Sequence, residues 1–91
     1  MKYNEELWDL LSKYINWAKF DWALLYIDDK NNIMVKDNEY NATYDIFWFL
    51  EIMYDNGMLD ECYSQEELIK LRDFIPYKEL KKEIEYYIKE N

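Results

Sequence analysis

The sequence contains no histidine and only one glycine, one proline and one cysteine among its 91 residues. Without histidine, the commonest general base is missing, and so are Ser-His and Cys-His nucleophile pairs and most catalytic zinc sites. The single glycine, Gly57, cannot build a phosphate-binding loop of the GxGxxG or P-loop type. These absences exclude many classes of enzyme, and we expect a non-enzymatic protein with no catalytic residue, no metal site and no cofactor.

Cysteine and long apolar runs are equally scarce. Cys62 has no second cysteine for an internal disulfide, and its neighbours Asp60 and Glu61 disfavour the reactive thiolate. The N-terminus lacks the basic start and apolar stretch of a secretion signal. The longest apolar run, residues 46–50, is far shorter than the ~20 residues of a membrane span. We therefore expect a cytoplasmic protein that does not bind membranes.

Lysine and arginine are missing from residues 37–67, a stretch that carries nine acidic residues. This stretch accounts for the whole net charge of −9, because acids and bases balance across the two flanks. It also holds seven aromatic residues, unlike the acid-rich, aromatic-poor segments that stay disordered. A folded acidic surface favours a basic protein partner, and it disfavours direct binding of nucleic acid.

The spacing of apolar residues predicts four helices and one β-hairpin. Helices are expected over residues 5–18, from Asn41 or Thr43 to residue 56, over residues 65–74, and from Pro76 onward. Strands are expected at residues 22–27 and 33–35, joined by the polar residues 28–32. The fold class is therefore α+β, with about four helices packed around the hairpin in the order α-β-β-α-α-α. We expect a single domain over residues 1–91.

Three short signals mark the predicted helix ends. Asn4 is a candidate N-cap for the first helix, and Gly57 supplies the left-handed residue that commonly follows a helix. Ser64 and Glu67 have the spacing of a capping box. The strand over residues 22–27 is almost entirely apolar, so both of its faces require cover from helices or from a partner edge.

Residues 28–39 begin with Asp and end with Glu, as does the twelve-residue calcium loop of an EF-hand. The interior does not fit this motif. Lys30 occupies the third position, where a ligand is needed, and Ile33 occupies the sixth, where the sharp turn needs glycine. Ile33 and Val35 are instead typical of a strand.

The second predicted helix gathers aromatic and acidic residues on one face. Tyr44, Trp48, Glu51 and Asp55 follow the spacing i, i+4, i+7 and i+11, which places them within a narrow arc. Tyr and Trp are enriched at binding hot spots, and carboxylates attract Lys or Arg. Alternatively, Tyr44 and Trp48 belong to the core. The predicted partner-binding residues are Asp37, Glu39, Tyr44, Asp45, Trp48, Glu51, Asp55, Asp60 and Glu61.

In size, acidity and lack of catalytic residues, the chain resembles the small phage-encoded inhibitors of host defence. These are the anti-CRISPR and antirestriction proteins, several of which mimic DNA. The resemblance covers the whole chain and rests on composition. It implies a DNA or RNA mimic that occupies the basic groove of a nuclease or nucleic-acid-binding protein. Two alternatives are an immunity protein or antitoxin against a basic toxin, and a scaffold domain that forms a homodimer or larger homo-oligomer.

Overall fold

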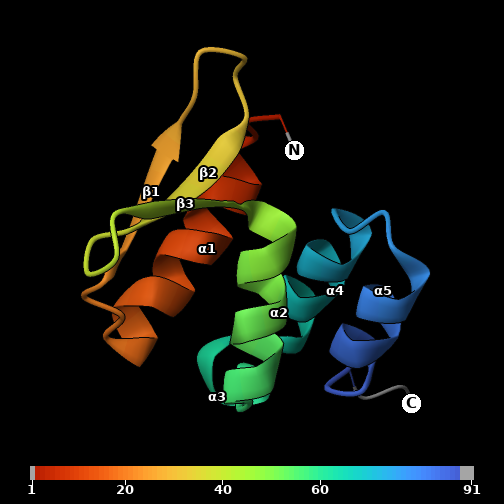
Figure 1. Cartoon of the computed structure of the whole chain (residues 1–91). Coiled ribbons are helices and arrows are strands. Elements are labelled where there is room, and N and C mark those ends of the chain that lie inside the picture. The colour runs from red at the N-terminus through yellow and green to blue at the C-terminus, as the bar shows by residue number, and fades with distance from the viewer. Residues whose placement is uncertain (1, 89–91) are drawn as a thin grey trace. The chain divides into compact units, whose positions relative to one another are not determined.

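The computed structural model describes residues 2–88 and shows an α+β fold (Figure 1). A three-stranded antiparallel sheet and five helices follow in the order α-β-β-β-α-α-α-α. The elements are α1 Glu5–Ala18, β1 Ala23–Ile27, β2 Ile33–Asp37, β3 Ala42–Asp45, α2 Ile46–Asn56, α3 Leu59–Cys62, α4 Gln65–Asp73 and α5 Lys78–Glu85. The predicted fold class is confirmed, and the structure adds one strand and one short helix to the predicted order.

The chain divides into two compact units after Leu50, a division that falls within α2. The first unit contains α1, the whole sheet and the first turn of α2. The second contains the rest of α2 and the three helices that follow. The single domain expected over residues 1–91 stays a prediction.

Helix α1 begins and ends where the sequence predicts. The Oδ1 atom of Asn4 accepts a hydrogen bond from the N–H of Leu7 (3.2 Å), and Lys19 ends the helix with a left-handed φ of 56°. The apolar side of α1 is buried at Leu7, Leu10, Leu11 and Tyr14. This helix covers one face of the sheet (Figure 1), on which Ile33 and Val35 are also buried. Burial of these facing apolar side chains stabilises the first unit.

The start of α2 differs from the prediction. Asn41 and Thr43 do not cap this helix: Asn41 lies in a turn with φ of 52°, and Thr43 lies in β3. Asp45 is the cap, because its Oδ1 accepts hydrogen bonds from the N–H groups of Phe47 (2.8 Å) and Trp48 (3.1 Å). The prediction failed because residues 42–45 pair with the outer side of β2 in a short hairpin, an arrangement that helical periodicity does not reveal.

The second unit follows its predicted helix signals more closely. Gly57 has the expected left-handed conformation, with φ of 76°, directly after α2. Ser64 and Glu67 form both hydrogen bonds of the capping box at the start of α4. Pro76 lies before α5 rather than in its first turn, because Tyr77 is the N-cap. The buried side chains of this unit include Met53, Leu59, Cys62, Tyr63, Leu68, Leu71, Ile75, Leu80 and Ile84.

None of the helices within residues 2–88 combines the length and the apolar composition needed to cross a bilayer.

Candidate partner-binding surface

The predicted partner-binding residues lie on both sides of the division between the units. Five belong to the first unit: Asp37, Glu39, Tyr44, Asp45 and Trp48. Four belong to the second unit: Glu51, Asp55, Asp60 and Glu61. They form two groups, each with its own geometry.

Asp37 is buried at the end of β2, where its carboxylate organises a turn. Its Oδ1 accepts hydrogen bonds from the N–H groups of Glu39 (2.9 Å) and Tyr40 (3.2 Å). A carboxylate that already accepts backbone hydrogen bonds within the protein is poorly placed to meet a partner. We therefore assign Asp37 a structural role, while Glu39 lies exposed on the turn that Asp37 holds.

Tyr44 and Trp48 form an aromatic step between β3 and α2. Their rings stack with centroids 4.0 Å apart and an interplanar angle of 23°. The Trp48 side chain remains 46% exposed, so it is not a core residue. Asp45 lies between them in sequence, and its carboxylate is exposed although it caps α2. The aromatic step, defined as Tyr44 and Trp48, thus presents a large apolar ring beside a negative charge, and Trp and Tyr are enriched at hot spots.

Three carboxylates of the second unit gather into what we call the carboxylate cluster, made of Glu51, Asp55 and Glu83. Glu51 and Asp55 are exposed and lie one helical turn apart on α2. Glu83 extends from α5. Its partial burial is the main cause that raises its pKa, and the negative charges of Asp55 and Glu51 raise it further. Within residues 2–88, no ion pair joins these carboxylates to Lys or Arg.

The sequence did not point to Glu83, because α5 mixes acids and bases and lies outside the acidic stretch. A signal was nevertheless available. Glu83 follows Leu80 by three residues and directly precedes Ile84, and these two apolar residues are buried. This spacing places Glu83 at the margin of the buried stripe of α5, where its charge is partly withdrawn from water.

Asp60 and Glu61 are exposed in the first turn of α3, near a pair of tyrosines. The rings of Tyr54 and Tyr87 meet edge to face with centroids 6.1 Å apart. Burial is the main cause that raises the pKa of Tyr87, and Tyr54 and Asp60 add to the effect. Asp60 therefore acts on a tyrosine that lies outside the acidic stretch of residues 37–67.

The cluster has no geometry suited to metal binding. Among residues 2–88, no group of three or more Cys, Asp or Glu side chains is arranged to hold a metal ion. Residues 28–39, which begin with Asp and end with Glu, contain the turn after β1, the strand β2 and the start of the next turn, and Ile33 and Val35 are buried strand residues.

No known protein family, curated protein or solved structure matches the chain.

Proposed function

We propose that this protein is a non-enzymatic inhibitor whose acidic surface occupies the basic groove of a nuclease or another nucleic-acid-binding protein. The observation that carries the proposal is the carboxylate cluster. Asp55 and Glu51 lie close enough to raise the pKa of Glu83, yet no basic side chain pairs with the three carboxylates in the described part of the chain. The Lys and Arg residues of a nucleic-acid groove supply the missing partners.

The position of Asp55 supports the proposal independently. Asp55 lies in the last turn of α2, a turn that contains no basic residue. A negative charge at this end of a helix opposes the helix dipole and lowers helix stability. The carboxylate cluster therefore combines an unfavourable helix position with mutual repulsion. A positively charged partner reduces both the unfavourable interaction of Asp55 with the helix dipole and the repulsion among the three carboxylates. This gain on binding favours a role for these acids in contacting a partner.

The spacing of the acids suits a groove that binds a phosphate backbone. Side chains one helical turn apart lie about 5–6 Å from each other, close to the spacing of phosphates along a strand. Glu51 and Asp55 have this relation on the exposed side of α2. They can therefore replace consecutive phosphates without presenting a scissile bond. Inhibition through this surface is stoichiometric and competes with nucleic acid.

A charge-reversal experiment tests the proposal. The protein and its Glu51→Lys/Asp55→Lys variant are titrated calorimetrically against a panel of purified nucleases and nucleic-acid-binding proteins. Glu5→Lys/Asp9→Lys is the matched control, because Glu5 and Asp9 are also exposed acids four residues apart on a helix. The control changes the net charge equally.

We expect the α2 variant to bind at least tenfold more weakly than the control variant, since each charge pair that it converts becomes repulsive. A short duplex DNA should displace the wild-type protein from its target. If both variants bound the target equally weakly, only the net charge would matter. If DNA did not compete, the protein would not bind in the nucleic-acid groove.

A further inference from the structure

Asn56 is the only asparagine of the chain that precedes a glycine, because Gly57 is the only glycine. The side chain of Asn56 is exposed at the end of α2. Glycine has no Cβ, so its backbone nitrogen can approach the preceding side-chain amide more closely than the nitrogen of any other residue. This pair therefore has less steric protection against deamidation than any other asparagine in the chain.

Deamidation at this pair needs only water. The backbone nitrogen of Gly57 attacks Cγ of the Asn56 side chain, so that a new C–N bond forms and the C–N bond of the side-chain amide breaks. Ammonia leaves with the proton of the Gly57 nitrogen, and a succinimide ring remains. Water then opens this ring at either carbonyl, which gives aspartate or isoaspartate in place of Asn56. The product carries one more carboxylate, and no oxidation or reduction takes place.

The fold protects Asn56 by holding the nitrogen that attacks it. The N–H of Gly57 donates hydrogen bonds to the carbonyls of Tyr54 (2.9 Å) and Met53 (3.2 Å) in α2. Both hydrogen bonds must break before the nitrogen can lose its proton and reach Cγ of Asn56. The reaction therefore requires the last turn of α2 to open.

The last turn of α2 is poorly stabilised by its own sequence. It contains no basic residue, and Asp55 opposes the helix dipole. Asn56 has a low helix propensity. Gly57 and Met58 follow with φ of 76° and 61°, and this left-handed conformation is unfavourable for Met58, which has a Cβ. Contacts from elsewhere in the chain must therefore hold this turn.

Tyr87, which follows α5, supplies such contacts. Its hydroxyl lies 3.7 Å from the position that a Cβ would occupy on Gly57. Its ring meets that of Tyr54 with centroids 6.1 Å apart, and its carbonyl accepts a hydrogen bond from Nε2 of Gln65 (3.0 Å). Burial raises the pKa of the Tyr87 hydroxyl, and a hydrogen bond from the backbone of Met58 acts in the opposite direction. Tyr87 therefore contacts the chain both before and after the Asn-Gly pair.

We propose that Asn56 is a deamidation site that the fold protects, and that Tyr87 is the positioning residue that sets its rate by holding the turn at Gly57. Conversion places a carboxylate beside Asp55 at the end of α2, where the helix dipole disfavours negative charge. Isoaspartate also inserts its Cβ into the main chain. Each converted molecule therefore has a weaker last turn and one more negative charge in the acidic stretch of residues 37–67.

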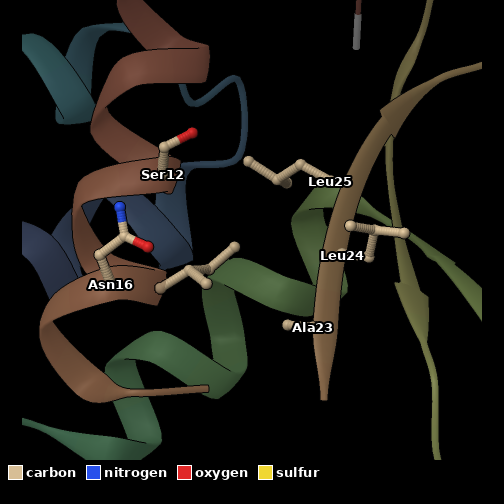
Figure 2. A pocket seen from close by; sticks show the side chains of 6 residues that line it. Ser12, Asn16, Ala23, Leu24 and Leu25 are labelled. Atoms are coloured by element: carbon tan, nitrogen blue, oxygen red, sulfur yellow. The ribbon is translucent and has the colours of Figure 1, made fainter. Parts of the chain in front are cut away.

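Asn16 provides an internal comparison. It is also an exposed asparagine of a helix, and it lines a groove of about 290 Å³ between α1 and β1 (Figure 2). Trp17 follows it, and the side chain of Trp17 hinders the approach of the backbone nitrogen. The two asparagines share exposure and helical position but differ in the residue that follows. We expect conversion at Asn56 and no detectable conversion at Asn16 over the same period.

Peptide mapping by mass spectrometry tests the proposal on the whole chain. The protein is incubated at mildly alkaline pH in buffer and, in parallel, in urea that unfolds it. Conversion at Asn56, measured as the gain in mass and as the isoaspartate content, should be at least tenfold slower in buffer than in urea. Asn56→Gln should remove the signal, because a glutamine side chain would have to form a larger ring.

Tyr87→Phe keeps the ring contact and removes the hydroxyl, so it should speed conversion of the folded protein at least threefold and leave the rate in urea unchanged. Tyr86→Phe is the matched control, because Tyr86 is the neighbouring tyrosine and is 80% exposed. Amide hydrogen exchange followed by NMR separates local opening from a general loss of stability. In Tyr87→Phe the N–H of Gly57 should exchange faster, while that of Leu71, which is buried in α4, should exchange as in the wild type.

Three results would overturn the proposal. The first is equal conversion of Asn56 in buffer and in urea, since the fold would then give no protection. The second is conversion in urea that is as fast at Asn16 as at Asn56, since the following glycine would then have no effect. The third is a Tyr87→Phe variant that converts at the wild-type rate, or in which the amides of Gly57 and Leu71 exchange faster to the same extent.

Discussion

At the scale of single residues, aspartates of identical charge have different roles. Asp28 accepts hydrogen bonds through Oδ1 from the N–H groups of Lys30 (2.9 Å) and Asn32 (2.8 Å), and the bond from Asn32 is the main cause that lowers its pKa. Asp37 and Asp45 also use Oδ1 to hold backbone N–H groups. An exposed aspartate such as Asp55 has no such bond in the described chain. The count of acids predicts a charged surface, whereas local geometry separates structural acids from those free to bind a partner.

Glu83 gives a prediction about pH. Its pKa is raised in the folded protein, so the folded state favours the protonated carboxyl. The protonated Glu83 carboxyl contributes fully to stability at pH values below its pKa in the unfolded chain. This contribution is lost as the pH rises through the higher pKa of Glu83 in the folded protein. Glu83→Gln, which is neutral at every pH, should therefore be more stable than the wild type at pH 7. The gain should be less than about 1 kcal/mol, because Glu83 is only half-buried and solvent screens its interactions with Asp55 and Glu51.

Chemical denaturation of both proteins between pH 3 and pH 8 measures this difference in stability. We expect the difference to disappear at about pH 3, below the ordinary glutamate pKa of 4.5. Glu85→Gln is the control, since Glu85 is an exposed residue of the same helix. A stability difference that is equal at all pH values would show that the effect does not come from the ionisation of Glu83.

Trp48 gives a prediction that separates binding from folding. Trp48→Ala removes the stack with Tyr44, and because the ring is 46% exposed we expect a loss of about 1–2 kcal/mol in folding, less than the about 3–5 kcal/mol of a core tryptophan. As a hot spot, the same ring should contribute at least about 2 kcal/mol to binding of a basic partner. Denaturation and calorimetric titration measure the two quantities.

Trp17→Ala is the matched control for Trp48. Trp17 is 39% exposed and also contacts a tyrosine, with its ring centroid 5.7 Å from that of Tyr14. This control should lower stability by a similar amount and leave affinity for the partner unchanged. Equal losses of affinity in the two variants would place the aromatic step outside the interface.

At the scale of elements, α2 has acids at both ends, and they act in opposite directions. Asp45 caps the N-terminus, where a carboxylate satisfies free N–H groups and complements the helix dipole. Asp55 lies in the last turn, where its charge opposes the dipole. Asp45→Ala should therefore lower the free energy of unfolding by about 1 kcal/mol, whereas Asp55→Ala should leave it unchanged or raise it slightly.

Thermal and urea denaturation of the two variants measures this difference in stability. Each variant replaces one aspartate by alanine, so the two results can be compared directly. If Asp55→Ala destabilised the protein as much as Asp45→Ala, Asp55 would have a structural role and the argument for its availability to a partner would fail. A loss of affinity in Asp55→Ala without a loss of stability is the expected combination.

The elements also show how far the sequence predicts this fold. Asn4, Gly57 and the capping box at Ser64 act on backbone groups within a few residues, and the structure confirms all three. Strand β3 was missed because its four residues are defined by pairing with β2. The participation of Glu83 in the carboxylate cluster was missed for a similar reason, since it depends on charges about 30 residues away in sequence. Local chemistry predicts helix ends, while pairing between strands decides short strands and charges distant in sequence decide charge clusters.

At the scale of the whole molecule, the net charge of −9 affects folding and binding in opposite ways. Repulsion among the acids destabilises the folded state, and the same charges attract a basic partner from a distance. Salt weakens both effects. Added salt should therefore raise the stability of the fold and slow association with the partner, and both effects can be measured by varying the salt concentration alone.

A rise in sodium chloride from about 0.1 M to about 1 M shortens the Debye length from about 10 Å to about 3 Å. We expect this change to raise the melting temperature and to slow partner association at least tenfold. The Glu51→Lys/Asp55→Lys variant should show a smaller rise and a flatter association rate, because it carries less unbalanced charge. Stopped-flow kinetics and calorimetry measure how the association rate and the melting temperature depend on salt.

A melting temperature that falls with salt would mean that favourable ion pairs outweigh repulsion in the fold. An association rate that does not depend on salt would mean that the acidic surface does not steer the partner, and the proposed inhibition of a basic groove would then lose its physical basis.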